Sequence, residues 1–331
     1  MCGLGAWGRN VARAFGCVEG AGLEWICEVD PDRARSLPSQ YPAARLTVSY
    51  DEVLRSNAEA VVLATPAALH FDMARRALEA GKHVYVEKPM TLRSADAETL
   101  VRLAGERKLT LMAGHLLEYH PAIESIKRMI DSGEAGDLYY MHTQRVNLGV
   151  VRRDENALWS LAPHDFSVIL HLFGEEPDSI SARGECFLQR GIEDVVFVNM
   201  HFPGGRMAQV HVSWLDPRKE RRMVIVGSRK MIEFDDMQPA EKIRIYDKGA
   251  DVAPLPSADM IGAIRVRHGD IHIPRIPSTE PLLAEARHFV ECVRTGQTPR
   301  SDGRDGLRVV RLLEAATDSL RQGGAPVRIA S

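Results

Sequence analysis

The sequence predicts an α/β fold class, with a doubly wound parallel sheet followed by a second α/β domain whose sheet is mainly antiparallel. Up to about residue 115, short apolar runs alternate with stretches of helical periodicity. After about residue 118, apolar runs follow one another without helices between them. The chain has 331 residues, 45% hydrophobic and 26% charged, which suffices for two globular domains. We therefore expect domains at 1–117 and 118–331.

Strands and helices of the first half are expected to form right-handed βαβ units. The run "HVYVE" is typical of a buried strand because β-branched and aromatic residues suit a pleated surface. In the segment 70–80, Phe71, Ala74 and Leu78 recur at helical spacing, and Gly81 is expected to end that helix. Strands are expected at 23–29, 60–65, 83–87 and 110–115, and helices at 8–19, 31–37, 51–56, 70–80 and 92–107.

The second half begins with helices and continues with strands separated by turn signals such as "PGG" and "GS". The segment 248–280 is rich in Pro and Gly and is predicted to be a long loop. Helices are expected at 121–132, 163–173, 280–295 and 303–322, and strands at 137–146, 178–188, 194–202, 206–215, 221–228, 230–235 and 241–247.

Composition excludes several classes of protein. A net charge of -3 gives no electrostatic basis for binding nucleic acid or an anionic membrane. Runs of ~20 apolar residues are absent, so no membrane span is expected. The N-terminus lacks a charged leader before an apolar core, so a cytoplasmic protein is expected. The 5 cysteines are widely spaced, which fits neither a disulfide framework nor a zinc site, and no metal is expected.

The stretch "GLGAWG" has the G-x-G-x-x-G spacing of a dinucleotide-binding turn, and a helix and a strand are expected after it. Glu28 lies 20 residues beyond Gly8, near the end of that strand. A carboxylate there would accept hydrogen bonds from the adenosine ribose and repel a 2′-phosphate, which favours NAD over NADP. The alternative is an exposed loop carboxylate. The cofactor-binding residues expected from this motif are Gly3, Gly5, Ala6, Trp7, Gly8 and Glu28.

The first strand is almost missing, because only Met1 and Cys2 precede Gly3. In a doubly wound sheet that strand is central and about five residues long. Either the start of the chain has been placed too late, which we favour, or the fold tolerates a stub.

Residues 60–90, "AVVLATPAALHFDMARRALEAGKHVYVEKPM", resemble the Gfo/Idh/MocA oxidoreductases, the glucose–fructose oxidoreductase and inositol dehydrogenase family. "ATP", His70, "AGKHV" and "EKP" stand in that family's order and spacing. The resemblance implies a Rossmann domain followed by a domain whose open sheet often forms oligomer contacts, here a homodimer or homotetramer. It also implies hydride transfer between a nicotinamide cofactor and a carbon of a sugar, cyclitol or nucleotide sugar.

The same resemblance implies two catalytic residues, Lys88 and His164. Lys88 would hold the reacting oxygen, and His164, in "WSLAPHDF", would exchange its proton. Here the sequence departs from the family pattern, because Ser160 and Ser167 replace the usual acids. This form resembles a subgroup associated with nucleotide-sugar pathways. The resemblance adds Ala64, Thr65, Pro66, His70, Glu87 and Lys88 to the expected cofactor site.

Five further residues are candidates for the substrate pocket, and four of them have a structural alternative. Tyr119 either reaches the substrate or packs. Arg145 and Asn147 alternate onto one face of a strand, where the arginine binds a phosphate or carboxylate or forms an ion pair. Trp159 is either a sugar-stacking platform or core, and Asp165 either meets substrate or favours the helix dipole.

The sequence therefore predicts an NAD-dependent oxidoreductase that acts on a sugar, with a nucleotide sugar favoured. Two alternatives stay open. One is an NAD-retaining, glycosidase-type enzyme of the same family, and the other is a non-catalytic NAD(H)-sensing protein.

Overall fold

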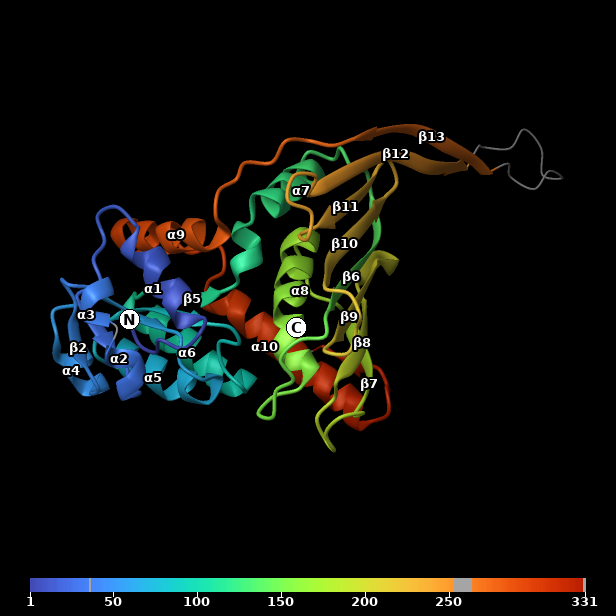
Figure 1. Ribbon diagram of the computed structural model, residues 1–331. Coiled ribbons are helices and arrows are strands. Elements are labelled where there is room, and N and C mark those ends of the chain that lie inside the picture. The colour runs from blue at the N-terminus through green and yellow to red at the C-terminus, as the bar shows by residue number, and fades with distance from the viewer. Residues whose placement is uncertain (36, 253–263, 330–331) are drawn as a thin grey trace. The chain divides into compact units, whose positions relative to one another are not determined.

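The computed structural model describes residues 1–35, 37–252 and 264–329 (Figure 1). They form two compact units. The first comprises Met1–His120 with Thr279–Glu314, and the second Pro121–Ser278 with Ala315–Ser331. This differs from a division at residue 117, because part of the C-terminal segment joins the first unit. The reason is burial, since Phe289 and Leu307 belong to hydrophobic clusters of that unit.

The first unit contains a parallel sheet. Its strands are β1 (Trp25–Cys27), β2 (Arg45–Thr47), β3 (Ala60–Leu63), β4 (His83–Glu87) and β5 (Leu111–Gly114). Cys2 bridges β1 and β3, pairing with Cys27 on one side and Leu63 on the other. The spatial order is therefore β2, β1, the Cys2 stub, β3, β4, β5, which is the order of doubly wound dinucleotide-binding sheets.

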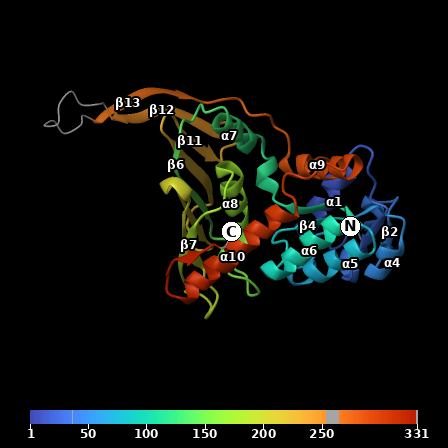
Figure 2. The same ribbon diagram turned by 180° about the vertical axis from the view of Figure 1, so that it is seen from behind.

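Helices cover both faces of this sheet, as the alternation of strand side chains requires. Val84 and Val86 of β4 face one hydrophobic cluster, and Tyr85 between them faces the other. The helices α5 and α6 lie side by side in both views (Figures 1 and 2), while α1 contacts α9. The unit's helices are α1 (Gly8–Gly16), α2 (Pro31–Arg35), α3 (Leu37–Gln40), α4 (Tyr50–Arg55), α5 (His70–Glu79), α6 (Ser94–Arg107) and α9 (Pro281–Thr295), with 3-10 turns η1 (Ala67–Leu69) and η2 (Leu116–Tyr119).

The second unit is built on a sheet ordered β13-β12-β11-β10-β6-β9-β8-β7-β14, which is antiparallel except between β6 and β9. The predicted mainly antiparallel sheet is thus confirmed. One face is covered by α8, which contacts β6, β8 and β9. The elements are α7 (Pro121–Asp131), β6 (Leu138–Val146), α8 (Ala157–Phe173), β7 (Ser179–Glu185), β8 (Val195–His201), η3 (Pro203–Gly205), β9 (Met207–Ser213), β10 (Glu220–Gly227), β11 (Met231–Asp235), β12 (Ile243–Val252), β13 (Ile264–His272) and β14 (Val327–Arg328); α10 (Gly303–Arg321) begins in the first unit.

Several expectations about secondary structure were wrong. The segment 248–280 is not simply a loop, because β12 continues into it and pairs with β13, although residues 253–263 lie outside the described part. β13 is exposed along nearly its whole length, so no alternation of apolar and polar residues marked it. The strand β2, short and mostly exposed, was missed for the same reason.

The helix expected at 163–173 begins earlier, at Ala157. Asn156 caps it, because its Oδ1 accepts a hydrogen bond of 3.0 Å from the backbone N–H of Trp159. Pro163 lies inside the helix rather than at its start. Among the residues described, none of the helices is both long and apolar enough to cross a bilayer.

Candidate functional site

The three glycines of the N-terminal turn differ in what a side chain at each position would meet. Gly3 has a φ of +83°, and a Cβ there would lie 2.7 Å from the carbonyl oxygen of Ala64. A Cβ on Gly8 would lie 2.2 Å from the Gly3 oxygen. At Gly5, in contrast, the nearest described atom is Nη1 of Arg33 at 3.8 Å. Gly3 and Gly8 are thus required by close packing, while Gly5 leaves open space beside the N-terminus of α1, the place where dinucleotide-binding folds bind a pyrophosphate.

Glu28 braces this turn from the end of β1. Its Oε2 accepts a hydrogen bond of 2.6 Å from the backbone N–H of Leu4, and its Oε1 accepts one of 2.9 Å from that of Asp30. The residue is only 5% exposed, so it is not a solvated loop carboxylate. Each carboxylate oxygen offers two acceptor positions, which leaves capacity for ribose hydroxyls.

The loops that follow β3 and β4 are joined by His70. Its Nδ1 lies 2.8 Å from the carbonyl oxygen of Pro89, and its Nε2 lies 2.8 Å from that of Thr65. His70 is buried, and this burial lowers its pKa despite both contacts. The ring therefore braces two loops at the carboxyl edge of the sheet, and any effect on a cofactor would pass through their backbone.

Glu87 ties the end of β4 to the glycine turn. Its Oε1 accepts a hydrogen bond of 2.7 Å from Nε1 of Trp7, and its Oε2 accepts one of 3.2 Å from the backbone N–H of Lys88. Burial raises the pKa of Glu87, and the Trp7 hydrogen bond and the Lys88 charge partly oppose that rise. Lys88 itself is half-buried at the carboxyl tip of the strand, where ligands bind in sheets of this kind.

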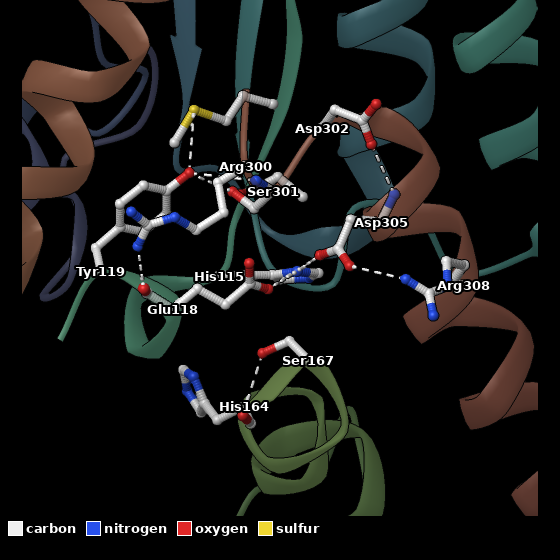
Figure 3. A network of polar contacts seen from close by, with 12 residues as sticks. His115, Glu118, Tyr119, His164, Ser167, Arg300, Ser301, Asp302, Asp305 and Arg308 are labelled. Carbon is white, nitrogen blue, oxygen red and sulfur yellow. Dashed lines mark hydrogen bonds and ion pairs between the residues drawn. The ribbon is translucent and has the colours of Figure 1, made fainter. Parts of the chain in front are cut away.

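A buried triad of one histidine and two acids, His115, Glu118 and Asp305, lies in the first unit (Figure 3). No sequence pattern predicted it. Nδ1 of His115 lies 2.6 Å from Oδ2 of Asp305 and 3.5 Å from Oε1 of Glu118. Burial opposes the charged imidazole, but the hydrogen bonds that it donates to these carboxylates outweigh the effect of burial and raise the pKa of His115 to about 10. Burial and the nearby Asp305 charge raise the pKa of Glu118 to about 8.

These three side chains could also hold a cation, because their ligand atoms lie within 4.8 Å of one another. However, the 2.6 Å contact has the length of a charge-assisted hydrogen bond. It is shorter than the roughly 3 Å that separates two ligands of one ion with bonds of about 2.1 Å. We therefore interpret the triad as an ion pair with an attached carboxyl group. His115 and Glu118 are three residues apart, but Asp305 is 190 residues away from His115, so no local sequence pattern could predict the triad.

Tyr119 belongs to the same region and is buried. Its hydroxyl lies 3.0 Å from Oγ of Ser301, and the guanidinium of Arg300 lies 4.8 Å from the centre of its ring (Figure 3). These contacts favour the packing alternative over direct contact with a substrate.

In the second unit, Arg145 and Asp165 are bound to each other. Nε and Nη2 of Arg145 donate hydrogen bonds of 2.7 and 3.3 Å to the two oxygens of Asp165, and both side chains are buried. This favours the ion-pair alternative for the arginine. Arg221 lies directly opposite Arg145 on β10. Burial, followed by the charge of Arg145, lowers the pKa of Arg221.

The remaining candidates of this unit are spread over its elements. Nε1 of Trp159 donates a hydrogen bond of 3.0 Å to Oγ1 of Thr317. Asn147 follows β6, and its backbone N–H donates to the Ser213 carbonyl at 3.2 Å. Figure 3 shows the His164 ring projecting outward from α8. The Ser167 hydroxyl donates to the backbone carbonyl of His164 at 3.1 Å.

Two family models match the chain. Residues 1–115 match the oxidoreductase family with an NAD-binding Rossmann fold, and residues 123–233 match the GFO/IDH/MocA C-terminal domain. The chain therefore belongs to the Gfo/Idh/MocA oxidoreductase family, and the expected fold and family are confirmed.

Named relatives span most of the chain. The UDP-N-acetylglucosamine 3-dehydrogenase of Acidithiobacillus ferrooxidans is 27% identical, over 94% of this chain and 93% of its own. A solved structure of that enzyme superposes with a TM-score of 0.81 at 26% identity, covering 97% of this chain and 96% of the other. The scyllo-inositol 2-dehydrogenase (NAD(+)) of Bacillus subtilis is 26% identical, with 93% and 89% covered. The 2,7-anhydro-N-acetylneuraminate hydratase of Escherichia coli K12 is 25% identical, with 74% and 69% covered.

Proposed function

We propose that this protein is an NAD-dependent dehydrogenase that transfers hydride to or from a hydroxyl or keto carbon of a sugar, with a nucleotide sugar favoured. The observation that carries the proposal is the hydrogen-bonded link between the glycine turn and the strand tip, in which Glu87 holds both Trp7 and the backbone of Lys88. The nucleotide-sugar preference is supported by the Acidithiobacillus relative, whose likeness extends over nearly the whole chain.

The choice of NAD over NADP rests on Glu28. Its buried carboxylate is fixed by two backbone N–H groups at the end of β1. A fixed anion there would accept hydrogen bonds from ribose hydroxyls and repel a 2′-phosphate. Loss of the carboxylate should therefore weaken NADH binding more than NADPH binding.

Lys88 and His164 have complementary roles in the proposed mechanism. A bound nicotinamide would supply or accept the hydride. The Lys88 ammonium would stabilise negative charge developing on the substrate oxygen, an effect worth about 2.7–4 kcal/mol for a well-placed donor. His164 would exchange the hydroxyl proton, which typically contributes ~10²–10⁴-fold. The two residues belong to different units, and each role is proposed from the residue's own chemistry.

The test is nicotinamide absorbance after mixing the protein with NAD and a panel of UDP-, GDP- and dTDP-sugars. Lys88→Met should lower kcat by ~10²–10³-fold while NADH still binds. Lys127→Met is the matched control, because Lys127 lies on α7 in an ion pair with Asp131. Activity that survives in Lys88→Met would contradict the catalytic role of this lysine.

A second candidate is an enzyme that retains its NAD and shows no net redox change. The Escherichia coli relative named a hydratase favours it, because addition of water changes no net oxidation state. Such an enzyme would convert its substrate without accumulating NADH. Product analysis by mass spectrometry, alongside absorbance, separates the two enzymes. A protein that only senses NAD(H) would bind it, and Lys88→Met would change no activity.

We also propose that the second unit's sheet forms a homodimer or homotetramer contact. Tyr140, Phe197 and Met207 are exposed on β6, β8 and β9, the strands whose alternate residues pack under α8. Exposed aromatic and Met side chains in a group are typical of interfaces. Tyr140→Glu with Phe197→Glu should reduce the mass measured by light scattering to that of a monomer. An unchanged mass would contradict this interface.

A further inference from the structure

One phenol hydroxyl in the first unit lies between two carboxyl groups. Oη of Tyr85 lies 3.2 Å from Oε1 of Glu87 and 3.0 Å from Oε2 of Glu285. Glu285 comes from α9, 200 residues along the chain. All three side chains are buried, with exposures of 0%, 7% and 1% for Tyr85, Glu87 and Glu285.

The number of protons restricts the charge states of this group. A phenol carries one hydrogen and can donate to one acceptor only, while an ionised carboxylate can only accept. Burial raises the pKa of Tyr85 well above its usual range, so its hydroxyl keeps its proton. Two ionised carboxylates would therefore leave one of the contacts without a hydrogen. One of the two carboxyl groups must be protonated and donate to Oη.

The surroundings decide which carboxyl group that is. Glu87 accepts hydrogen bonds from Nε1 of Trp7 and from the backbone N–H of Lys88, and the Lys88 charge lies nearby. Oε1 of Glu285, in contrast, has no hydrogen-bond partner among the described residues. An anion is stabilised where donors surround it and is costly where they do not. The negative charge therefore belongs on Glu87 and the proton on Glu285.

The titratable groups around Glu285 also favour its protonated form overall. Burial raises the pKa of Glu285 well above its usual range, and the charges of Glu87 and Glu118 add to the rise. The contact with the Tyr85 hydroxyl and the charge of His115 lower the pKa of Glu285 without reversing the rise.

We propose that Glu285 is a neutral carboxylic acid that donates to Tyr85, and that Tyr85 in turn donates to an anionic Glu87. This one-way chain makes Glu285 and Tyr85 positioning residues. They keep the charge on Glu87, which holds Trp7 of the glycine turn and the backbone of Lys88. Only the consequence for Lys88 rests on the proposed function, because the hydrogen-bond direction follows from the contacts alone.

Close packing holds the Tyr85 side chain in place. Its ring centre lies 5.3 Å from that of Phe15 and 5.9 Å from that of Phe289, both edge-on. On the strand beside it, Gly114 leaves the space that the hydroxyl occupies, since a Cβ there would lie 2.8 Å from Oη. Helix α9 thus contributes both the proton donor and one wall of its pocket.

Infrared spectroscopy tests the location of the proton. At about pH 7, an ordinary glutamate is ionised and shows no carbonyl band of a protonated acid. We expect such a band in the unmutated protein, and we expect it to disappear in Glu285→Gln and to persist in Glu87→Gln. Because Glu118 is present in every variant, subtracting each variant's spectrum from that of the unmutated protein removes its contribution. Loss of the band in Glu87→Gln alone, or no change in Glu285→Gln, would overturn the proposal.

NADH affinity, measured by fluorescence titration, tests the positioning role without requiring turnover. Glu285→Gln keeps an N–H donor for Oη and should bind NADH within about twofold of the unmutated protein, whereas Glu285→Leu should bind about tenfold more weakly. Glu291→Leu, exposed on the same helix, is the matched control. Should Glu285→Leu fail to fold, Tyr85→Phe interrupts the same chain and should weaken binding alike. Equal affinity in all variants would refute the positioning role, whether or not a sugar is oxidised.

Discussion

Removing the negative charge from the buried triad should change how stability depends on pH. In Asp305→Asn, the His115 imidazole loses the carboxylate that lies 2.6 Å from its Nδ1. The side chains of His115 and Asp305 are 2% and 11% exposed, so water cannot replace the lost partner. The substitution keeps the shape of the side chain and changes its charge.

The direction in which stability changes with pH follows from the pKa of each group in the folded chain. His115 has a pKa of about 10 when folded, against ~6.5 when unfolded, so its stabilisation is complete below pH ~6.5 and disappears as pH rises through about 10. The pKa of Glu118 is raised to about 8, so the protein also loses stability as pH rises through the range below that value. Asp305, whose pKa is lowered by His115 against the effect of burial, acts in the opposite direction and only in acid.

The magnitude comes from the same values. A displacement from ~6.5 to about 10 corresponds to at most about 5 kcal/mol at 1.36 kcal/mol per pKa unit. Removing one partner of a buried ion pair costs about 3–5 kcal/mol. We therefore expect Asp305→Asn to lower the free energy of unfolding by about 3–5 kcal/mol near pH 6, with the difference shrinking toward zero near pH 10.

The assay is urea unfolding followed by circular dichroism at several pH values between about 6 and about 10. Asp318→Asn is the control, because Asp318 lies on the same helix in an ion pair with Arg321 whose members are 53% and 75% exposed. A difference between Asp305→Asn and the unmutated protein that stays constant across this range would refute a protonated His115. Addition of EDTA should leave both curves unchanged if the triad holds no ion.

Three further predictions follow from the contacts. Asp165→Asn leaves Arg145 buried without a charged partner and should cost about 3–5 kcal/mol of unfolding free energy. The double variant with Arg145→Met should recover part of this loss, and additive losses in urea unfolding would contradict the pairing. Gly114→Ala places a Cβ 2.8 Å from Tyr85 Oη and should cost about 1–3 kcal/mol by overpacking, with weaker NADH binding; a melting temperature and affinity like the unmutated protein's would show that the space is not needed. Glu28→Ala should weaken NADH binding by about tenfold or more and NADPH binding less; fluorescence titrations showing equal losses would contradict the role of the carboxylate.

Much of the first unit could be predicted because its signals are local. The alternation of apolar runs and amphipathic stretches reports burial on a scale of a few residues, and the helices on both faces of the sheet follow from it. Gly3 and Gly8 are required by backbone approaches within one turn and the adjoining strand. Glu28 stands at the end of the next strand, so its spacing from the glycines places it beside them. Lys88, at the tip of β4, is a further local prediction, and its role stays a proposal.

The tertiary structure decided which polar groups are paired. Arg145 could have bound a ligand phosphate or an acid of its own chain, and only the packing of α8 on β6 showed that Asp165 meets it. Asp305 and Glu285 reach their partners across 190 and 200 residues. Short-range patterns indicate which residues are buried and how the backbone turns, because those properties depend on neighbours. The charge state of a buried acid depends on donors brought from distant segments, so the folded chain alone determines it.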